Sequence, residues 1–135
     1  MGKFLVTSSI IIALANVDRA QDHLPALQVD PRLMLAAQEK ADDMAAKDYF
    51  AHVSPDGKSP WYWFSHAGYD FRFAGENLAV GFSDADGINS AWMGSALHRA
   101  NILDVNYTEI GVATATGMYE GMPTIYVAEE FGSPK

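Results

Sequence analysis

Two strand-like segments near the C-terminus constrain the fold more than any other feature, because they are apolar on both faces. Residues 107–116 and 124–131 are rich in β-branched, aromatic and small residues and are joined across a glycine-containing stretch. Within the first segment, Ile110 and Val112 point to one face and Ala113 points to the other. A sheet that is apolar on both faces needs other elements to cover both sides.

Helical patterns earlier in the chain supply these covering elements. We expect helices over residues 8–21, from Pro31 to about Asp48, from Pro60 to Gly68, and after Ser83. Asp30 before Pro31 is a typical N-cap, and Ser83 with Asp86 three residues later resembles a capping box. One face of the last helix is formed by Ile88, Ala91, Trp92 and Ser95.

The helix that begins at Pro31 has a regular apolar pattern. The positions predicted to be buried are Leu33, Ala37, Ala41 and Met44. The positions predicted to face solvent are Gln38, Lys40, Asp43 and Lys47. A strand over residues 71–81 follows the short helix at Pro60 and adds a third strand to the sheet.

These elements together predict an α+β fold, a three-layer α-β-α sandwich with a central antiparallel sheet. The chain has 135 residues and no repeat or low-complexity tract, so we expect a single domain over residues 1–135. It has no cysteine, so packing of the core rather than disulfide bonds must stabilise it.

The charge balance argues against one class of partner. The net charge is −8, and only nine lysines and arginines are scattered along the chain. Such a surface repels the phosphate backbone at long range, so nucleic acid is not expected as a partner.

The N-terminal segment is open to two interpretations. A basic residue followed by the apolar residues 4–6 and 10–15 resembles a signal peptide, with Ala-Leu-Ala at residues 13–15 as the cleavage motif. Polar residues at positions 7–9 make the apolar run shorter than a membrane span, so no transmembrane segment is expected. Continued to Arg19, the segment forms an amphipathic helix that packs on the domain, and we expect this helix.

Three groups that can bind metal or transfer protons lie in segments that otherwise resemble buried structure: His52, Glu76 and His98. Two neutral imidazoles with a carboxylate and water can form an open zinc or copper site. The same side chains can act as general acids and bases. The structural alternative is that the histidines hydrogen-bond loops to the sheet while Glu76 caps backbone amides.

The remaining candidates have simpler explanations. His23 is expected to be solvated in a polar linker, and His66 is explained by packing or by the dipole of the helix that it ends. No serine lies in the G-x-S-x-G motif of a hydrolase nucleophile. The aromatic residues 61–64 are expected to pack in the core rather than to line a ligand groove.

Several ordered motifs resemble the bacterial branch of the CAP superfamily, which groups cysteine-rich secretory proteins, insect antigen five and plant pathogenesis-related proteins. The motifs are Phe50-Ala51-His52-Val53-Ser54-Pro55-Asp56-Gly57, Ala67-Gly68-Tyr69, Gly75-Glu76-Asn77-Leu78, residues 92–103, residues 107–112 and Phe131-Gly132. Shorter matches at residues 16–19, 24–27 and 29–33 extend the resemblance over nearly the whole chain. The resemblance implies the same α-β-α sandwich.

The resemblance also implies a central cavity with two histidines and two acidic residues, which holds a divalent metal in some members. Three of these four positions are matched by His52, Glu76 and His98. The second acidic position falls on Ser95, and Glu129 or Glu130 on the last strand are candidates to replace it.

Members of this superfamily share no reaction, so a fold does not fix a function here. The resemblance implies a secreted or envelope-associated, extracellular or periplasmic, binding module whose cavity takes a small lipid, a peptide or a cell-wall component. A divalent metal such as zinc would be held by His52 and His98 with Glu76 nearby, and would not be required for folding. The alternatives are a metal-dependent, protease-like hydrolase in which Glu76 is the base, and a purely structural extracellular domain.

Overall fold

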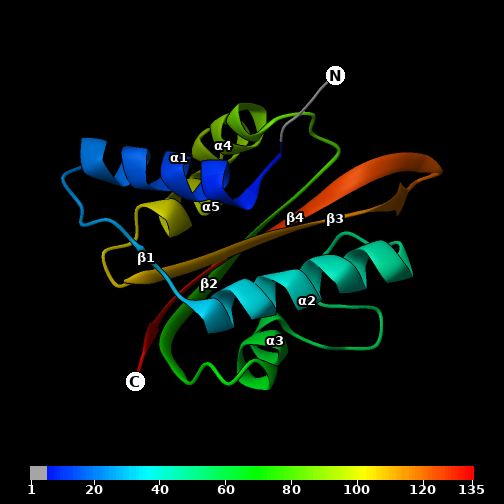
Figure 1. Cartoon of the computed structure of the whole chain (residues 1–135), viewed down its shortest axis with the longest axis horizontal. Helices are drawn as coiled ribbons and strands as arrows, with labels where there is room; N and C mark the ends of the chain where they lie inside the picture. The colour runs from blue at the N-terminus through cyan, green and yellow to red at the C-terminus, as the bar shows by residue number, and fades with distance from the viewer. Residues whose placement is uncertain (1–5) are drawn as a thin grey trace.

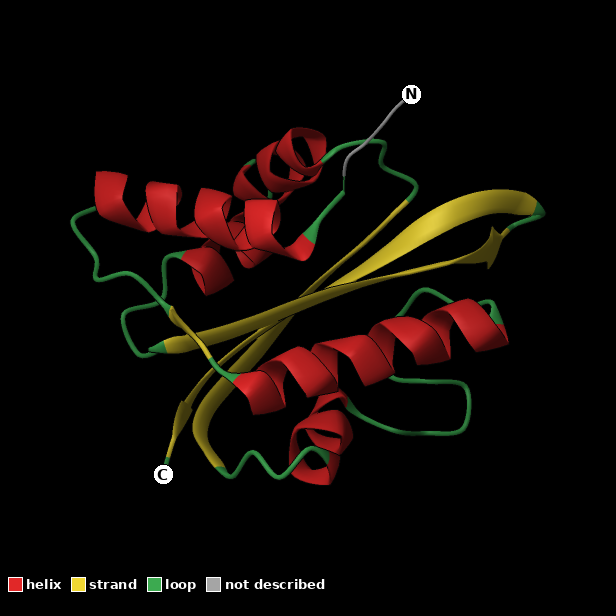
Figure 2. Cartoon of the chain, viewed as in Figure 1, coloured by secondary structure: helices red, strands yellow, loops and turns green. Residues whose placement is uncertain are grey.

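The computed structural model describes residues 6–135, which form three layers with a sheet between two groups of helices (Figure 1). The helices are α1 Ser8–Gln21, α2 Pro31–Lys47, α3 Pro60–His66, α4 Ala85–Met93 and α5 Ala96–Ile102. The strands are β1 Gln28–Val29, β2 Phe71–Val80, β3 Glu109–Tyr119 and β4 Met122–Pro134. Helices α1, α4 and α5 cover one face of the sheet, and α2 and α3 cover the other (Figure 2). The predicted α-β-α sandwich is therefore confirmed.

The sheet has the strand order β1-β3-β4-β2. The three long strands are antiparallel, as predicted, and β4 lies between β3 and β2. Strand β1 was not predicted from the sequence; it pairs in parallel with β3 through only two residues. A strand of two residues is too short to produce a recognisable alternation of apolar and polar positions.

The hairpin between β3 and β4 is longer and its turn is tighter than the sequence pattern indicated. The two strands pair up to Tyr119 and Met122. Glu120 and Gly121 between them both have positive φ, of 50° and 82°, which is typical of a two-residue hairpin turn.

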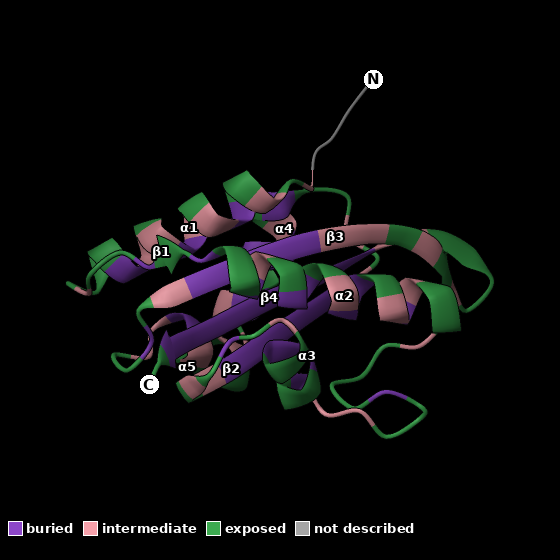
Figure 3. Ribbon diagram, turned by 60° about the horizontal axis from the view of Figure 1, so that its bottom comes forward, coloured by how far each residue is buried: buried purple, intermediate pink, exposed green. Residues whose placement is uncertain are grey.

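Each face of the sheet has its own apolar core. On the side of α1, α4 and α5 the core includes Ile11, Ile88, Trp92, Ile110 and Val127. On the side of α2 it includes Ala37, Ala41, Met44, Leu78 and Tyr126. Figure 3 shows that β4, the central strand, is buried along most of its length. The predicted division of Ile110 and Val112 from Ala113 between the two faces is confirmed.

Helix α1 confirms the predicted helix over residues 8–21. It buries Ile11 and Ala15 against the sheet, and the guanidinium of Arg19 donates hydrogen bonds to four backbone carbonyl oxygens, those of Pro25, Ile102, Asp104 and Tyr107. The first residues of the proposed signal-like segment, 1–5, lie outside the described residues. Among residues 6–135, no helix is both long and apolar enough to span a membrane.

Three details of the predicted helices are wrong. The N-cap of α4 is Asp84 rather than Ser83, and its carboxylate accepts a hydrogen bond of 2.7 Å from the backbone N–H of Gly87. The chain turns after α4 and begins the separate helix α5, so the predicted apolar face ends at Trp92, and Ala91 on that face is exposed. Lys40, predicted to face solvent, is fully buried. The reason is that its ammonium group finds three acceptors in the loop after α2.

The packing of α2 on β3 depends on a residue without a side chain. A Cβ atom on Gly111 would overlap the backbone of Leu33 and Met34. We therefore expect Gly111→Ala to lower the free energy of unfolding by about 2 kcal/mol through overpacking. Urea denaturation measures this, and Gly94→Ala, at the end of α4, is the matched control with an expected loss below about 1 kcal/mol. Equal losses in the two variants would contradict the account.

Candidate functional site

The candidate site lies along the free edge of β2, which is the last strand of the sheet. Three alternate carbonyl oxygens of this edge accept hydrogen bonds from side chains that follow β2 in the sequence: Ala74 from Tyr107 (3.1 Å), Glu76 from Asn101 (3.2 Å) and Leu78 from Trp92 (3.0 Å). Gly75 permits this arrangement, because a Cβ atom there would overlap the hydroxyl of Tyr107. The edge is therefore covered by side chains instead of a further strand.

The backbone N–H groups of the same residues also point toward this edge. In an antiparallel pair the N–H and C=O of one residue point to the same side. The N–H of Gly81 donates to Ile125 on β4, so the amides of Glu76, Leu78 and Val80 point away from β4. These three amides have no hydrogen-bond acceptor among the described residues.

Two hollows lie one after the other along this edge. The first, of about 370 Å³, is lined by His52, Pro60, Trp61, Ala74, Gly75, Glu76, Asn101 and Tyr107. The second, of about 220 Å³, is lined by Phe50, Leu78, Ala79, Val80, Phe82, Ala91, Trp92, Ser95 and His98. The first contains ionisable groups and the second is mostly apolar. Trp61 was predicted to pack in the core, but it is 40% exposed and lines the first hollow.

His52 and Glu76 are in direct contact in the first hollow. His52 Nδ1 lies 2.8 Å from Glu76 Oε1, and the histidine side chain is 55% exposed while the glutamate side chain is 1% exposed. Because a carboxylate oxygen only accepts, Nδ1 of the ring carries the hydrogen in this contact. The ring of His52 therefore lies in the hollow, and the buried carboxylate of Glu76 holds it there through Nδ1.

Glu130 lies beside Glu76, as its partner across β2 and β4. Burial and the neighbouring carboxyl group of Glu76 raise the pKa of Glu130 well above its ordinary value. If both groups were ionised, Glu76 Oε2 and both carboxyl oxygens of Glu130 would be buried acceptors without a donor. One proton held by Glu130 supplies a donor for the contact between the two groups.

Glu129, the other candidate for a second acid, points to the opposite face of the sheet. Its Oε1 accepts a hydrogen bond of 3.1 Å from Asn77, whose own side-chain oxygen accepts one of 2.9 Å from Asn101. Burial raises the pKa of Glu129 to about 8. Of the two glutamates, Glu130 is therefore the one next to Glu76.

His98 lines the apolar hollow rather than the hollow of His52 and Glu76. Its Nδ1 lies 2.7 Å from the hydroxyl of Ser95. Burial, and secondly the charge of nearby His52, lower the pKa of His98. The two rings are therefore close enough to interact electrostatically, although each has a different hydrogen-bond partner.

The described residues do not fit a metal ion held by three protein ligands. Among residues 6–135, no group of three or more histidine, cysteine, aspartate or glutamate side chains is arranged to hold one. His52 and Glu76 bind each other, and His98 binds Ser95. The arrangement thus gives no support to the predicted metal site, and no step of a metal-dependent reaction follows from it.

The less favoured candidates lie away from this edge. His66 contacts Glu39 on the surface at 2.9 Å, and His23 is exposed in the turn after α1. Asn101 and Tyr107 were not predicted to cover β2, although both lie within the motifs named above. Lys40 was not predicted as a site residue either, because the helical period alone placed it on the solvent side.

The family description "CAP: Cysteine-rich secretory protein family" matches residues 12–129. This match covers most of the chain, so the chain belongs to the CAP family, which confirms the resemblance given by the motifs.

Three similar proteins place the chain among bacterial relatives. An uncharacterized protein of Bacillus subtilis (strain 168), YkwD, is 40% identical over 102 residues, which are 76% of this chain and 40% of that protein. An extracellular protein containing a SCP domain from Bacillus anthracis has 28% identity and a TM-score of 0.79, over 93% of this chain and 39% of that one. An outer surface protein from Borrelia burgdorferi shares the fold, with 21% identity and a TM-score of 0.81 over 94% and 92% of the two chains. The chain thus spans less than half the length of two of these relatives.

The buried carboxyl group of Glu129 predicts a pH dependence of stability. Its pKa is about 8 in the folded protein and 4.5 ordinarily, so between these values the unfolded chain binds fewer protons. The contribution of Glu129 is therefore complete below pH 4.5 and is lost as the pH rises through 8.

We expect Glu129→Gln, which stays neutral, to remove this loss. The variant should melt about 5 °C above the wild type at pH 8.5, and the difference should shrink at pH 5. Differential scanning calorimetry at both pH values measures it. A difference that is the same at both values, or that grows at pH 5, would contradict a raised pKa for Glu129.

Proposed function

We propose that the chain is an extracellular CAP domain that binds a small, neutral, amphipathic molecule along the free edge of β2. The observation that carries the proposal is the succession along one strand of a mostly apolar hollow and a second hollow lined in part by His52, Glu76 and Asn101. Relatives described as extracellular or outer-surface proteins support the location.

The apolar hollow suits the hydrocarbon part of a ligand. Phe50, Phe82 and Trp92 contribute aromatic surface, and Leu78 and Val80 also line the hollow. A volume of about 220 Å³ is below the usual range for drug-sized ligands, so the hollow fits a short alkyl chain or a single ring.

The backbone of β2 favours a ligand that offers hydrogen-bond acceptors. The amides of Glu76, Leu78 and Val80 point into the edge, whereas the carbonyl oxygens of Glu76 and Leu78 already accept bonds from Asn101 and Trp92. These covering side chains stand where an added strand would lie, which disfavours a peptide bound by strand addition. Hydroxyl, ether or ester oxygens would accept from the open amides without needing a carbonyl partner.

Charge disfavours an anionic head group. The chain has a net charge of −8, and the buried Glu76 lies at the polar end of the edge. A carboxylate or phosphate ligand would be repelled by both. A neutral head group, such as a sugar, avoids this repulsion.

Octyl glucoside, below its micelle concentration, is a probe with both parts of the proposed ligand. In a titration followed by amide chemical shifts, we expect changes at residues 78–82 and 91–98. Ala91→Trp, which fills the apolar hollow, should weaken binding at least about tenfold, which corresponds to about 1.4 kcal/mol of binding free energy.

Ala100→Trp is the matched control, because Ala100 is an exposed alanine on α5 that does not line the hollow. It should bind the probe like the wild type, and glucose without the alkyl chain should bind much more weakly. No binding to the wild type, or equal weakening by the two variants, would contradict the proposed function.

A further inference from the structure

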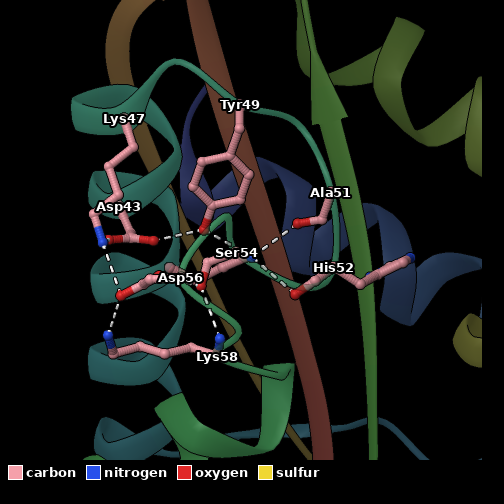
Figure 4. Close-up of polar contacts among 9 residues, drawn as sticks. Asp43, Lys47, Tyr49, Ala51, His52, Ser54, Asp56 and Lys58 are labelled. Atoms are coloured by element: carbon pink, nitrogen blue, oxygen red, sulfur yellow. Dashed lines mark hydrogen bonds and ion pairs between the residues drawn. The ribbon is translucent and has the colours of Figure 1, made fainter.

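Lys40 on α2 has an environment that its exposed neighbours on the helix do not share. Its side chain is fully buried, and its Nζ donates to Tyr49 Oη (3.1 Å), to the carbonyl oxygen of Ala51 (2.8 Å) and to that of His52 (2.9 Å). An ammonium group has three donors, so every donor of Lys40 is used. Figure 4 shows the acceptor residues Tyr49, Ala51 and His52 where the loop after α2 passes the helix.

All three acceptors belong to one short segment, residues 49–52. This segment has no regular secondary structure, and Ala51 and His52 are exposed. A segment of this kind is held in one conformation only by specific contacts. The two carbonyl bonds fix the backbone at the residue whose ring contacts Glu76.

The charge of Lys40 also interacts with the carboxyl groups of Glu76 and Glu130. Burial lowers the pKa of Lys40, while the carboxyl groups of Glu76, Glu130 and Asp43 act in the opposite direction. A buried ammonium group is stable only when it is well paired. Lys40 therefore contacts the loop that carries His52 and interacts electrostatically with the pair of glutamates on the sheet.

Other contacts also join this loop to α2: the Tyr49 hydroxyl donates to the partly buried Asp43 at 2.6 Å, and Lys47 forms an exposed ion pair with Asp56. Lys47 lies 3.4 Å from Asp56 at the outer end of the loop, and its second ion pair, with Asp43 at 3.0 Å, lies within α2 itself (Figure 4). Exposed ion pairs of this kind contribute roughly 0–1 kcal/mol. They are therefore weak candidates for fixing the position of His52.

We infer that Lys40 is a positioning residue of the proposed site, which holds the backbone of residues 51–52 so that the ring of His52 binds Glu76 through Nδ1. Lys40 does not contact the ligand groove itself. The inference rests on the proposed site, but its test needs no ligand.

The tautomer of His52 is the readout that a purely structural role would not change. In the wild type at pH 7.5, ring nitrogen chemical shifts should identify His52 as the Nδ1–H tautomer, because Nδ1 donates to Glu76. In Lys40→Met we expect this preference to be lost and the Nε2–H form of free histidine to predominate. Lys47→Met, which removes an exposed pair on the same helix, should retain the Nδ1–H form.

Two results would overturn the inference. One is a Lys40→Met variant that is folded, by its amide spectrum, and still has the Nδ1–H tautomer at His52. The other is a wild-type protein in which His52 is the Nε2–H tautomer, which decides the matter even if Lys40→Met does not fold. Failure of octyl glucoside to bind would contradict the proposed function and leave this result unaffected.

Discussion

An edge strand carries a row of backbone groups that no neighbouring strand pairs, and in this chain that strand is β2. Its outward carbonyl oxygens at Ala74, Glu76 and Leu78 accept from Tyr107, Asn101 and Trp92, which lie on three later parts of the chain. These side chains satisfy the carbonyl oxygens but leave the outward backbone N–H groups of Glu76, Leu78 and Val80 without acceptors among the described residues. The two hollows and the His52–Glu76 contact lie along this covered edge.

The register between β2 and β4 determines which acids meet. Because Glu76 lies opposite Glu130 and Asn77 lies opposite Glu129, the side chains of the two neighbouring glutamates of β4 lie on different faces of the sheet. On the side of α2, Glu130 lies beside Glu76, and the ammonium group of Lys40 interacts electrostatically with both. On the side of α5, Glu129 joins an amide network of Asn77 and Asn101. A shift of one residue in this register would exchange these roles.

Much of the fold was predictable from local patterns. The apolar period of α2 identified Leu33, Ala37, Ala41 and Met44, and all four are buried. The same period was wrong about Lys40, because it contains no information about the carbonyl groups that the loop after α2 brings to the helix. Strand β1 and the division between α4 and α5 were missed because each is a short feature fixed by its tertiary contacts.

The candidate site was predictable in its residues but not in their grouping. Motifs singled out His52, Glu76 and His98, yet the pairing of the first two and the separate hollow of His98 follow from which side of β2 each reaches. Asn101 lies in the same motif as His98, and its side-chain amide donates to the carbonyl oxygen of Glu76. This role of Asn101 can be recognised only from the three-dimensional structure.

Hydrogen exchange of the backbone amides of β2 tests the central claim that its outer edge is the binding edge. The account predicts that the amides of Asn77 and Ala79, which point toward β4, exchange slowly with or without octyl glucoside. It predicts that the amides of Glu76, Leu78 and Val80 exchange faster in the free protein and become protected when the probe is added. Equal exchange of the two sets, or protection by the probe elsewhere in the protein but not at these three amides, would contradict it.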